Sequence, residues 1–294
     1  MNSYNKETIF YLPGLFKFTN LYEALLRKYT ENYYVFKDNV YIGAIYGSPT
    51  AIWNGGRFSS NLLLNYTQLT TVKNMMSNYK IPVRFTFTNC LLEEKHLNDT
   101  YCNLILKIFN TGNNEIICNS QVLEDYLRNT YGNQYKYISS TTKRLLDTEL
   151  QTEEINKDYF LTVLDYDHNK NFEYLHSIKN KNKCELLVNP VCYPKCPYRA
   201  AHYRSISKSQ LEYSAEDLMV CKFNGRDCLW HAMKLENFIS IEDINNIYLP
   251  MGYYHFKLEG RAAQPLDVIE ILLYYLIKEE YQNEVRSYLQ EAIW

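Results

Sequence analysis

The sequence predicts an α/β protein of the (β/α)8 barrel type, a TIM-type barrel formed as a single domain over residues 1–294. Short β-rich runs alternate with helical stretches along the chain, and eight such runs can be counted. Several runs are apolar throughout, which is typical of parallel strands buried on both faces. The 294 residues also suit this fold, whose usual length is roughly 250. A doubly wound open sheet is the alternative.

The predicted elements follow one another in regular order. The helical segments LYEALLRKY, NLLLNYTQLTTVKNMMSNY, VLEDYLRNTY and NFEYLHSIKN follow the first, second, fourth and sixth β-rich runs. For the eighth strand, residues 247–249 are a less favoured alternative. The eight runs are IFYLPGLF (9–16), VYIGAIY (40–46), VRFTFTN (83–89), EIICN (115–119), YKYISS (135–140), FLTVLD (160–165), ELLVN (185–189) and HFKL (255–258).

Two regions fall outside this alternation. Residues 191–236 predict an irregular insertion between the seventh and eighth strands, at the face where barrel enzymes carry their chemistry. Residues 265–294 predict C-terminal helices. Their most apolar part, VIEILLYYLI (268–277), is too short to cross a membrane and fits a buried or interface helix. The N-terminus has no pattern of a secretory leader, so we expect a cytoplasmic protein without a membrane partner.

The composition is that of a globular protein whose small net charge gives no strong electrostatic field. Hydrophobic residues make up 46% and charged residues 22% of the chain, which argues against disorder. The formal charge of −2 gives no general attraction for nucleic acid, although a local basic patch leaves such a partner open. In a cytoplasmic chain the eight cysteines are expected to be thiols or metal ligands rather than disulfides.

Four cysteines form the strongest local motif. Cys192 and Cys196 lie in the proline-stiffened segment CYPKCP, and Cys221 and Cys228 complete the pattern C-x3-C-x24-C-x6-C. Four thiolates in irregular spacing suit an iron–sulfur cluster, whereas the x6 gap argues against structural zinc. The alternative is that Cys221 and Cys228 are small buried hydrophobic residues.

Two further segments carry candidate binding residues. WNGGR, after the second strand, presents Asn54 and Arg57 beside paired glycines, and an arginine there suits a carboxylate or phosphate. FKLEGR, at the last strand, alternates Lys257, Glu259 and Arg261 with apolar or small residues, so a strand points all three to one side. We expect these five residues to bind substrate. Either segment is also compatible with a structural role.

Polar residues gather at several other strand exits and suit a small polar ligand, although such residues also cap helices. The sequence contains no nucleophile elbow G-x-S-x-G, no phosphate loop G-x-x-x-x-G-K and no zinc motif H-E-x-x-H. No motif therefore supports a serine hydrolase, a nucleotide hydrolase or a zinc peptidase of the H-E-x-x-H type. The strand-exit residues are Asn89, Asn119, Ser139, Ser140, Thr141, Thr142, Asp165, Asp167 and His202.

The order of VYIGAIYGSP, WNGGR, the cysteine segment and FKLEGR resembles the collagenase-like peptidase family, from about residue 9 to 261. That family includes the ubiquinone-hydroxylation proteins U and V and related RNA-hydroxylation proteins. FKLEGR is similar to the family's lysine-x-glutamate-glycine-arginine segment. The resemblance implies a barrel, a [4Fe–4S] cluster in several members, and heterodimers in some.

When the family's cluster ligands are matched to this sequence, the resemblance implies that Cys192 and Cys196 form one ligand pair. Cys221 and Cys228 follow in the order expected for the remaining two cluster ligands. This chain has CYPKCPYRAAHY where the family has a glycine-rich peptidase signature, which argues against peptidase activity. The leading hypothesis is an iron–sulfur enzyme of oxygen-independent redox or hydroxylation chemistry, acting on a small anionic or aromatic substrate. The alternatives are a peptidase or other hydrolase, and a non-catalytic subunit that docks a protein partner through its C-terminal helix.

Overall fold

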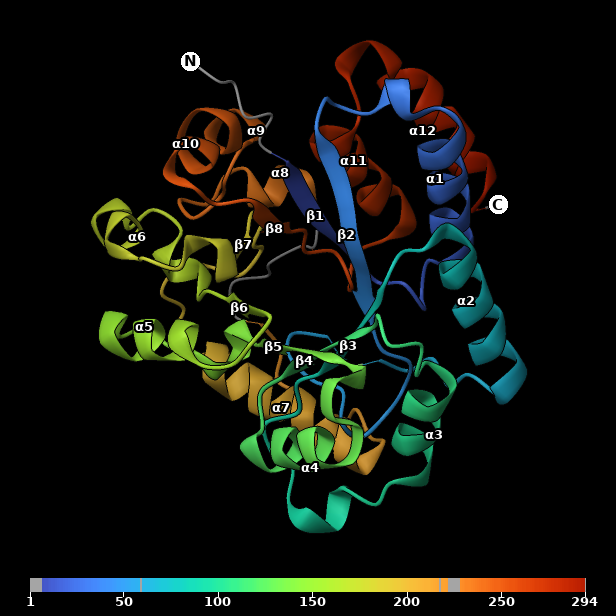
Figure 1. Ribbon diagram of the computed structural model, residues 1–294, viewed down its shortest axis with the longest axis vertical. Helices are drawn as coiled ribbons and strands as arrows, with labels where there is room; N and C mark the ends of the chain where they lie inside the picture. Colours follow the sequence, from blue (N-terminus) through green and yellow to red (C-terminus); the bar gives the residue numbers. More distant parts are fainter. Residues whose placement is uncertain (1–6, 59, 217, 222–227, 294) are drawn as a thin grey trace.

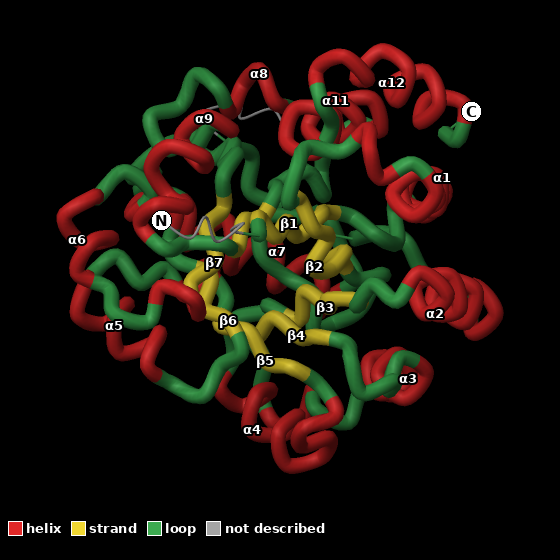
Figure 2. The backbone as a smooth tube through the Cα atoms, turned by 45° about the horizontal axis from the view of Figure 1, so that its top comes forward, coloured by secondary structure: helices red, strands yellow, loops and turns green. Residues whose placement is uncertain are grey.

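The computed structural model describes residues 7–58, 60–216, 218–221 and 228–293. Its eight strands are parallel and pair in chain order, and β8 pairs with β1 to close a barrel (Figures 1 and 2). This confirms the predicted fold class. The strands are β1 (Thr8–Pro13), β2 (Val40–Gly47), β3 (Val83–Phe87), β4 (Glu115–Cys118), β5 (Lys136–Ser139), β6 (Leu161–Val163), β7 (Cys184–Leu187) and β8 (His255–Lys257).

Helices surround the barrel, and one connection is much longer than the rest. The surrounding helices are α1 (Thr19–Glu31), α2 (Tyr66–Tyr79), α3 (Thr100–Ile108), α4 (Gln121–Tyr131), α5 (Thr148–Asn156), α6 (Phe172–Ser177), α11 (Pro265–Leu276) and α12 (Gln282–Glu291). The connection between β7 and β8 contains α7 (Arg199–Glu212), α8 (Leu229–Ala232), α9 (Ile241–Asp243) and α10 (Leu249–Met251).

The sequence led us to expect an irregular insertion over residues 191–236, but part of this region is helical. It contains α7, a helix of 14 residues, and the short α8. The buried face of α7 is polar, so the helix shows no apolar stripe from which it could be recognised. Residues 247–249, the alternative for the eighth strand, are helical.

Each strand is buried on both faces, which explains the apolar runs. In β1, Phe10 and Leu12 face the surrounding helices, whereas Tyr11 points into the barrel. β2 repeats this alternation with Ile45 facing out and Tyr46 facing in. The apolar part of the barrel interior consists of Ile9, Tyr11, Ala44, Tyr46, Ile117, Ile138, Leu161 and Val163.

A bulge in β2 makes room for one of these interior side chains. The register between β1 and β2 shifts by one residue at Gly43. A Cβ at Gly43 would lie 2.6 Å from the Tyr11 ring, so only glycine fits there. The Tyr11 ring in turn lies 3.6 Å from the guanidinium carbon of Arg84, which is fully buried. The bulge thus allows an aromatic ring to pack on a buried cation.

Arg84 on β3 is the centre of an interior ion cluster with Glu115 on β4 and Glu185 on β7. Its Nε is 2.5 Å from Glu115 Oε2 and its Nη1 is 2.5 Å from Glu185 Oε2. Burial alone would lower the pKa of Arg84, but the two carboxylates raise it above its ordinary value. The guanidinium therefore stays charged and joins β3 to its neighbour β4 and, across the barrel, to β7.

The apolar C-terminal segment packs against its own barrel. Ile269, Leu272 and Leu276 of α11 are fully buried in the outer core. α12 packs on α1, where Lys28 Nζ lies 2.8 Å from Glu284 Oε1. The segment is therefore the buried helix that the sequence predicted as one of two possibilities. Trp294 lies outside the described residues. Among the described helices, none is long and apolar enough to span a membrane.

Replacing Arg84 with methionine should destabilise the fold strongly. The substitution leaves two buried carboxylates without their cation, which typically costs about 3–5 kcal/mol of unfolding free energy. Urea denaturation measures the loss. Arg27→Met, on the exposed face of α1, is the matched control and should leave the midpoint unchanged.

The triple variant Arg84→Met, Glu115→Gln, Glu185→Gln should recover part of the loss, because no buried charge is left unpaired. An Arg84→Met protein as stable as the wild type would contradict the role assigned to the interior ion cluster.

Candidate functional site

A narrow pocket opens inside the barrel, at the carboxyl ends of the strands. Its volume is about 60 Å³, enough for about four to six water-sized groups. This is the end of the barrel at which enzymes of this fold carry their active sites. The pocket is lined by Tyr46, Arg57, Phe58, Thr86, Thr88, Ile117, Ser140, Thr141, Thr142, Tyr166, Leu187, Tyr203, Lys257, Glu259, Arg261 and Ala262.

Three basic side chains from distant segments line this pocket, and all three are among the residues that the sequence predicts to bind substrate. Arg57 follows β2, Lys257 ends β8, and Arg261 lies just beyond β8. Glu259 also lines the pocket, where its Oε1 is 2.9 Å from Arg57 Nε. Because β8 ends at Lys257, the strand alternation expected from the sequence does not extend to Glu259 and Arg261. The site therefore holds three basic side chains and one acidic side chain, which favours an anionic ligand.

Arg261 is held in place by hydrogen bonds to neutral acceptors. Its Nη1 donates to Thr86 Oγ1 at 3.0 Å and to Asn54 Oδ1 at 3.4 Å, and its Nη2 donates to the carbonyl of Gly55 at 3.1 Å. Asn54 is fully buried and donates to Gln210 Oε1 at 2.9 Å. Asn54, a predicted substrate-binding residue, therefore lies behind Arg261 and positions it.

The paired glycines of the second segment serve close packing. A Cβ at Gly55 would lie 2.7 Å from backbone atoms of Thr88 and Asn89 at the end of β3. Gly56 has a φ of +88°, which favours glycine, and a Cβ there would lie 2.9 Å from Arg261 Nη2. The two glycines allow the loop to lie directly over β3 and leave the Arg261 guanidinium room.

Lys257 is a buried amine between the pocket and the interior ion cluster. Its Nζ lies 3.8 Å from Glu185 Oε1 and 4.3 Å from the centre of the Tyr46 ring. Burial lowers its pKa to about 7, with Arg84 and Arg261 contributing in the same direction and Glu185 opposing them. A large fraction of Lys257 is therefore uncharged at neutral pH, unlike an ordinary lysine.

Hydroxyl groups cover the remaining wall of the pocket. Tyr166 and Tyr203 bring their hydroxyl oxygens within 3.2 Å of each other. Thr88 Oγ1 and Thr141 Oγ1 are buried and make no hydrogen bond with any described residue. Because buried hydroxyls normally have a partner, these two atoms are suited to a bound ligand or water.

Helix α7 crosses the mouth of the barrel; it lies within the outline of the strand ring in Figure 2. Its first turns meet the exit of β6, through Tyr203 and Tyr166. Its last turns meet the exits of β2 and β3, where Asn89 Nδ2 donates to the Ser207 carbonyl and the backbone N–H of Ser60 to Gln210 Oε1. The helix is thus fixed at both ends and covers the pocket.

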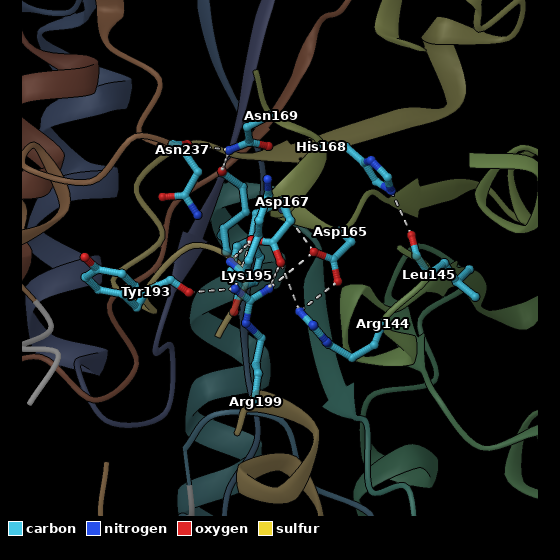
Figure 3. A network of polar contacts seen from close by, with 12 residues as sticks. Arg144, Leu145, Asp165, Asp167, His168, Asn169, Tyr193, Lys195, Arg199 and Asn237 are labelled. Carbon is cyan, nitrogen blue, oxygen red and sulfur yellow. Dashed lines mark hydrogen bonds and ion pairs between the residues drawn. The ribbon is translucent and has the colours of Figure 1, made fainter. Parts of the chain in front are cut away.

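Arg199, the first residue of α7, fixes one end of this cover (Figure 3). It is buried, and its guanidinium donates to both carboxylate oxygens of Asp167 at 3.0 and 2.9 Å and to Asp165 at 3.3 Å. Arg144 approaches the same two aspartates from the loop after β5. Burial alone would raise the pKa of Asp167, but the bonds from Arg199 lower it below its ordinary value.

The cysteine segment lies next to this network. Cys192 and Cys196 are buried and pack with Tyr166 and Leu187, both of which line the pocket. Cys228 is buried and Cys221 partly exposed; residues 222–227 between them lie outside the described residues. In the described part of the chain, no three His, Cys, Asp or Glu residues are arranged to hold a metal ion. Among the described residues, the four thiolates are therefore not brought together at one point.

Some of the remaining polar residues near the strand exits have structural partners. Asn189 bonds with both backbone groups of Glu259 and so joins the exits of β7 and β8. Asn119 donates to Thr142 Oγ1 at 2.8 Å, and Ser140 Oγ bonds the same atom. His202 lies on α7 and its Nε2 is buried without a hydrogen-bond partner among the described residues.

Sequence reasoning missed the residues that α7 contributes. Arg199, Tyr203, Ser207 and Gln210 are buried on one face of the helix. Their spacing of four, four and three residues is helical, so the pattern was present. It was not recognised because the face is polar: it packs over a polar pocket rather than an apolar core.

The fold is similar to that of a solved structure described as the U32 peptidase Mk0906, with a TM-score of 0.53 and 13% sequence identity over 88% of this chain and 95% of that chain. The Bacillus cereus spore cortex-lytic enzyme SleL matches with a TM-score of 0.42 and 12% identity, over 92% of this chain and 74% of that one. At these identities the first likeness shows a shared fold. No protein-family model and no curated protein matches the sequence.

Replacing Arg199 with methionine should loosen α7 while the barrel stays folded. The change removes the cation that joins the helix to Asp165 and Asp167, so the free energy of local unfolding of α7 falls. Hydrogen–deuterium exchange of residues 199–212 should become at least about tenfold faster. Lys208→Met, on the exposed face of the same helix, should leave exchange unchanged. Equal exchange in both variants would contradict the role assigned to the ion pairs of Arg199 with Asp165 and Asp167.

Proposed function

We propose that the protein is a barrel enzyme related to the collagenase-like peptidases that binds a small carboxylate-bearing substrate at the mouth of its barrel. The observation that carries the proposal is that Arg57, Lys257 and Arg261 line one narrow pocket. The likeness of fold to a U32 peptidase supports the family relationship that FKLEGR and WNGGR indicate.

The size and charge of the pocket favour a carboxylate over larger anions. A volume of about 60 Å³ holds few atoms beyond a carboxylate and its substituent. Arginine binds a carboxylate through two parallel N–H bonds, and the unpartnered hydroxyls of Thr88 and Thr141 supply further donors. Glu259 lies in the same pocket and opposes a highly charged anion such as phosphate.

Peptide hydrolysis is supported less well. A hydrolase needs a nucleophile within hydrogen-bond reach of a base. The Ser140 hydroxyl bonds Thr142, and Thr142 accepts from Asn119. These hydroxyls are engaged with one another and with an amide, so neither is activated as a nucleophile.

Acetate should bind the protein, and its neutral isostere acetamide should not. Each arginine contributes a charge-assisted hydrogen bond, so Arg57→Gln and Arg261→Gln should each weaken acetate binding about tenfold or more. Isothermal titration calorimetry measures the affinities. Arg286→Gln is the matched control, because Arg286 pairs with Glu270 on the outer helices. Equal binding of acetate and acetamide would contradict the proposal.

Iron–sulfur chemistry is a second candidate, and the packing of Cys192 and Cys196 beside the pocket-lining Tyr166 favours it. On this hypothesis, protein purified without oxygen contains about four irons per chain with matching sulfide. Cys192→Ala and Cys196→Ala should lose both, whereas Cys184→Ala, at the other end of β7, should retain them. Wild-type protein without iron or sulfide would rule this candidate out.

A further inference from the structure

We propose that Lys257 is a nucleophilic amine that forms an imine with a small carbonyl compound carrying a carboxylate, such as a 2-oxo acid. The inference rests on the proposed function, because Arg57 and Arg261 would hold the carboxylate of the same molecule. It names the substrate class of the pocket and the residue that reacts with it.

The position of Lys257 leaves its nitrogen free to react. It is the last residue of β8 and lines the pocket, with only 7% of its surface exposed. Its Nζ makes no hydrogen bond with any described residue, and Glu185 Oε1 is 3.8 Å away. Glu185 directs its other oxygen to Arg84 at 2.5 Å. The carboxylate that would normally hold the lysine as a cation is therefore largely taken by Arg84.

The charges around Lys257 come from several strands and favour the neutral amine. Arg84 on β3 and Arg261 beyond β8 repel a proton, whereas Glu185 on β7 and Glu259 attract it. Burial is the largest effect, and together these groups bring the pKa to about 7. At neutral pH the fraction of free amine is then much larger than in an ordinary lysine.

The pocket also supplies proton donors. The hydroxyls of Tyr166 and Tyr203 lie 3.2 Å apart, and burial raises the pKa of each above its ordinary value. Both therefore stay protonated. The Tyr46 hydroxyl, by contrast, donates to the carbonyl of Leu258 and is not free for this role.

The reaction balances without an oxidant or reductant. The nitrogen lone pair of Lys257 attacks the carbonyl carbon, and the carbonyl oxygen takes up a proton to give a carbinolamine. The C–O bond then breaks, the oxygen leaves as water, and a carbon–nitrogen double bond forms. The two hydrogens of the amine and the carbonyl oxygen make up the water released.

Pyruvate with sodium borohydride tests this inference, because borohydride reduces an imine to a stable secondary amine. Intact mass should show one reduced pyruvate per chain, and peptide mapping should place it on Lys257. Lys257→Arg and Lys257→Met should remain unlabelled. Lys170→Arg, which replaces a lysine paired with Asp243 outside the pocket, should be labelled like the wild type. The labelling rate of the wild type should rise with pH through a midpoint at about pH 7 and level off at higher pH.

Acetate binding, measured on the same samples, separates the two proposals. Acetate binding without label on Lys257 would overturn the imine and leave the carboxylate site standing. Label spread over surface lysines, unchanged in Lys257→Arg and rising beyond pH 9, would also overturn it. Neither acetate binding nor label in folded wild-type protein would overturn both proposals. Tyr166→Phe should slow labelling of Lys257 without abolishing acetate binding.

Discussion

The ion pair network of Arg84 with Glu115 and Glu185 is the constraint on which the rest of the barrel interior depends. A charged guanidinium in this position needs both carboxylates, so β3, β4 and β7 must meet it at fixed distances. It also needs the Tyr11 ring, which only the bulge at Gly43 admits. The interior ion cluster and the apolar side chains around it fill the barrel, and the pocket lies beyond them at the carboxyl ends of the strands.

The same network determines the chemistry of the pocket above it. Burial is the main reason that Lys257 loses its proton more readily than an exposed lysine, and the proximity of Arg84, which also engages Glu185, acts in the same direction. The two arginines of the mouth are fixed independently, Arg57 through Glu259 and Arg261 through Asn54 and Thr86. Helix α7 then closes the site from one side.

The barrel could be predicted from the sequence because strands buried on both faces leave largely apolar runs, as in β1 and β2. The residues that matter inside it could not, because Arg84 stands in the run VRFTF as any outward-facing arginine would. The sequence also predicted that Lys257, Glu259 and Arg261 lie together, and they do, although only Lys257 belongs to β8. Their partners Glu185, Arg57 and Asn54 come from segments far away in the chain and could not be predicted. The cover formed by α7 was missed because its buried face is polar.

The protonation state of Lys257 is the central claim, and it can be measured directly. Lysine labelled with ¹³C at the ε position gives one NMR signal per side chain, and Lys257→Arg identifies the signal of Lys257. The account predicts a titration midpoint at about 7 for this signal in the wild type. A midpoint near 10, as in an ordinary lysine, would contradict it, because Glu185 would then hold Lys257 as a cation.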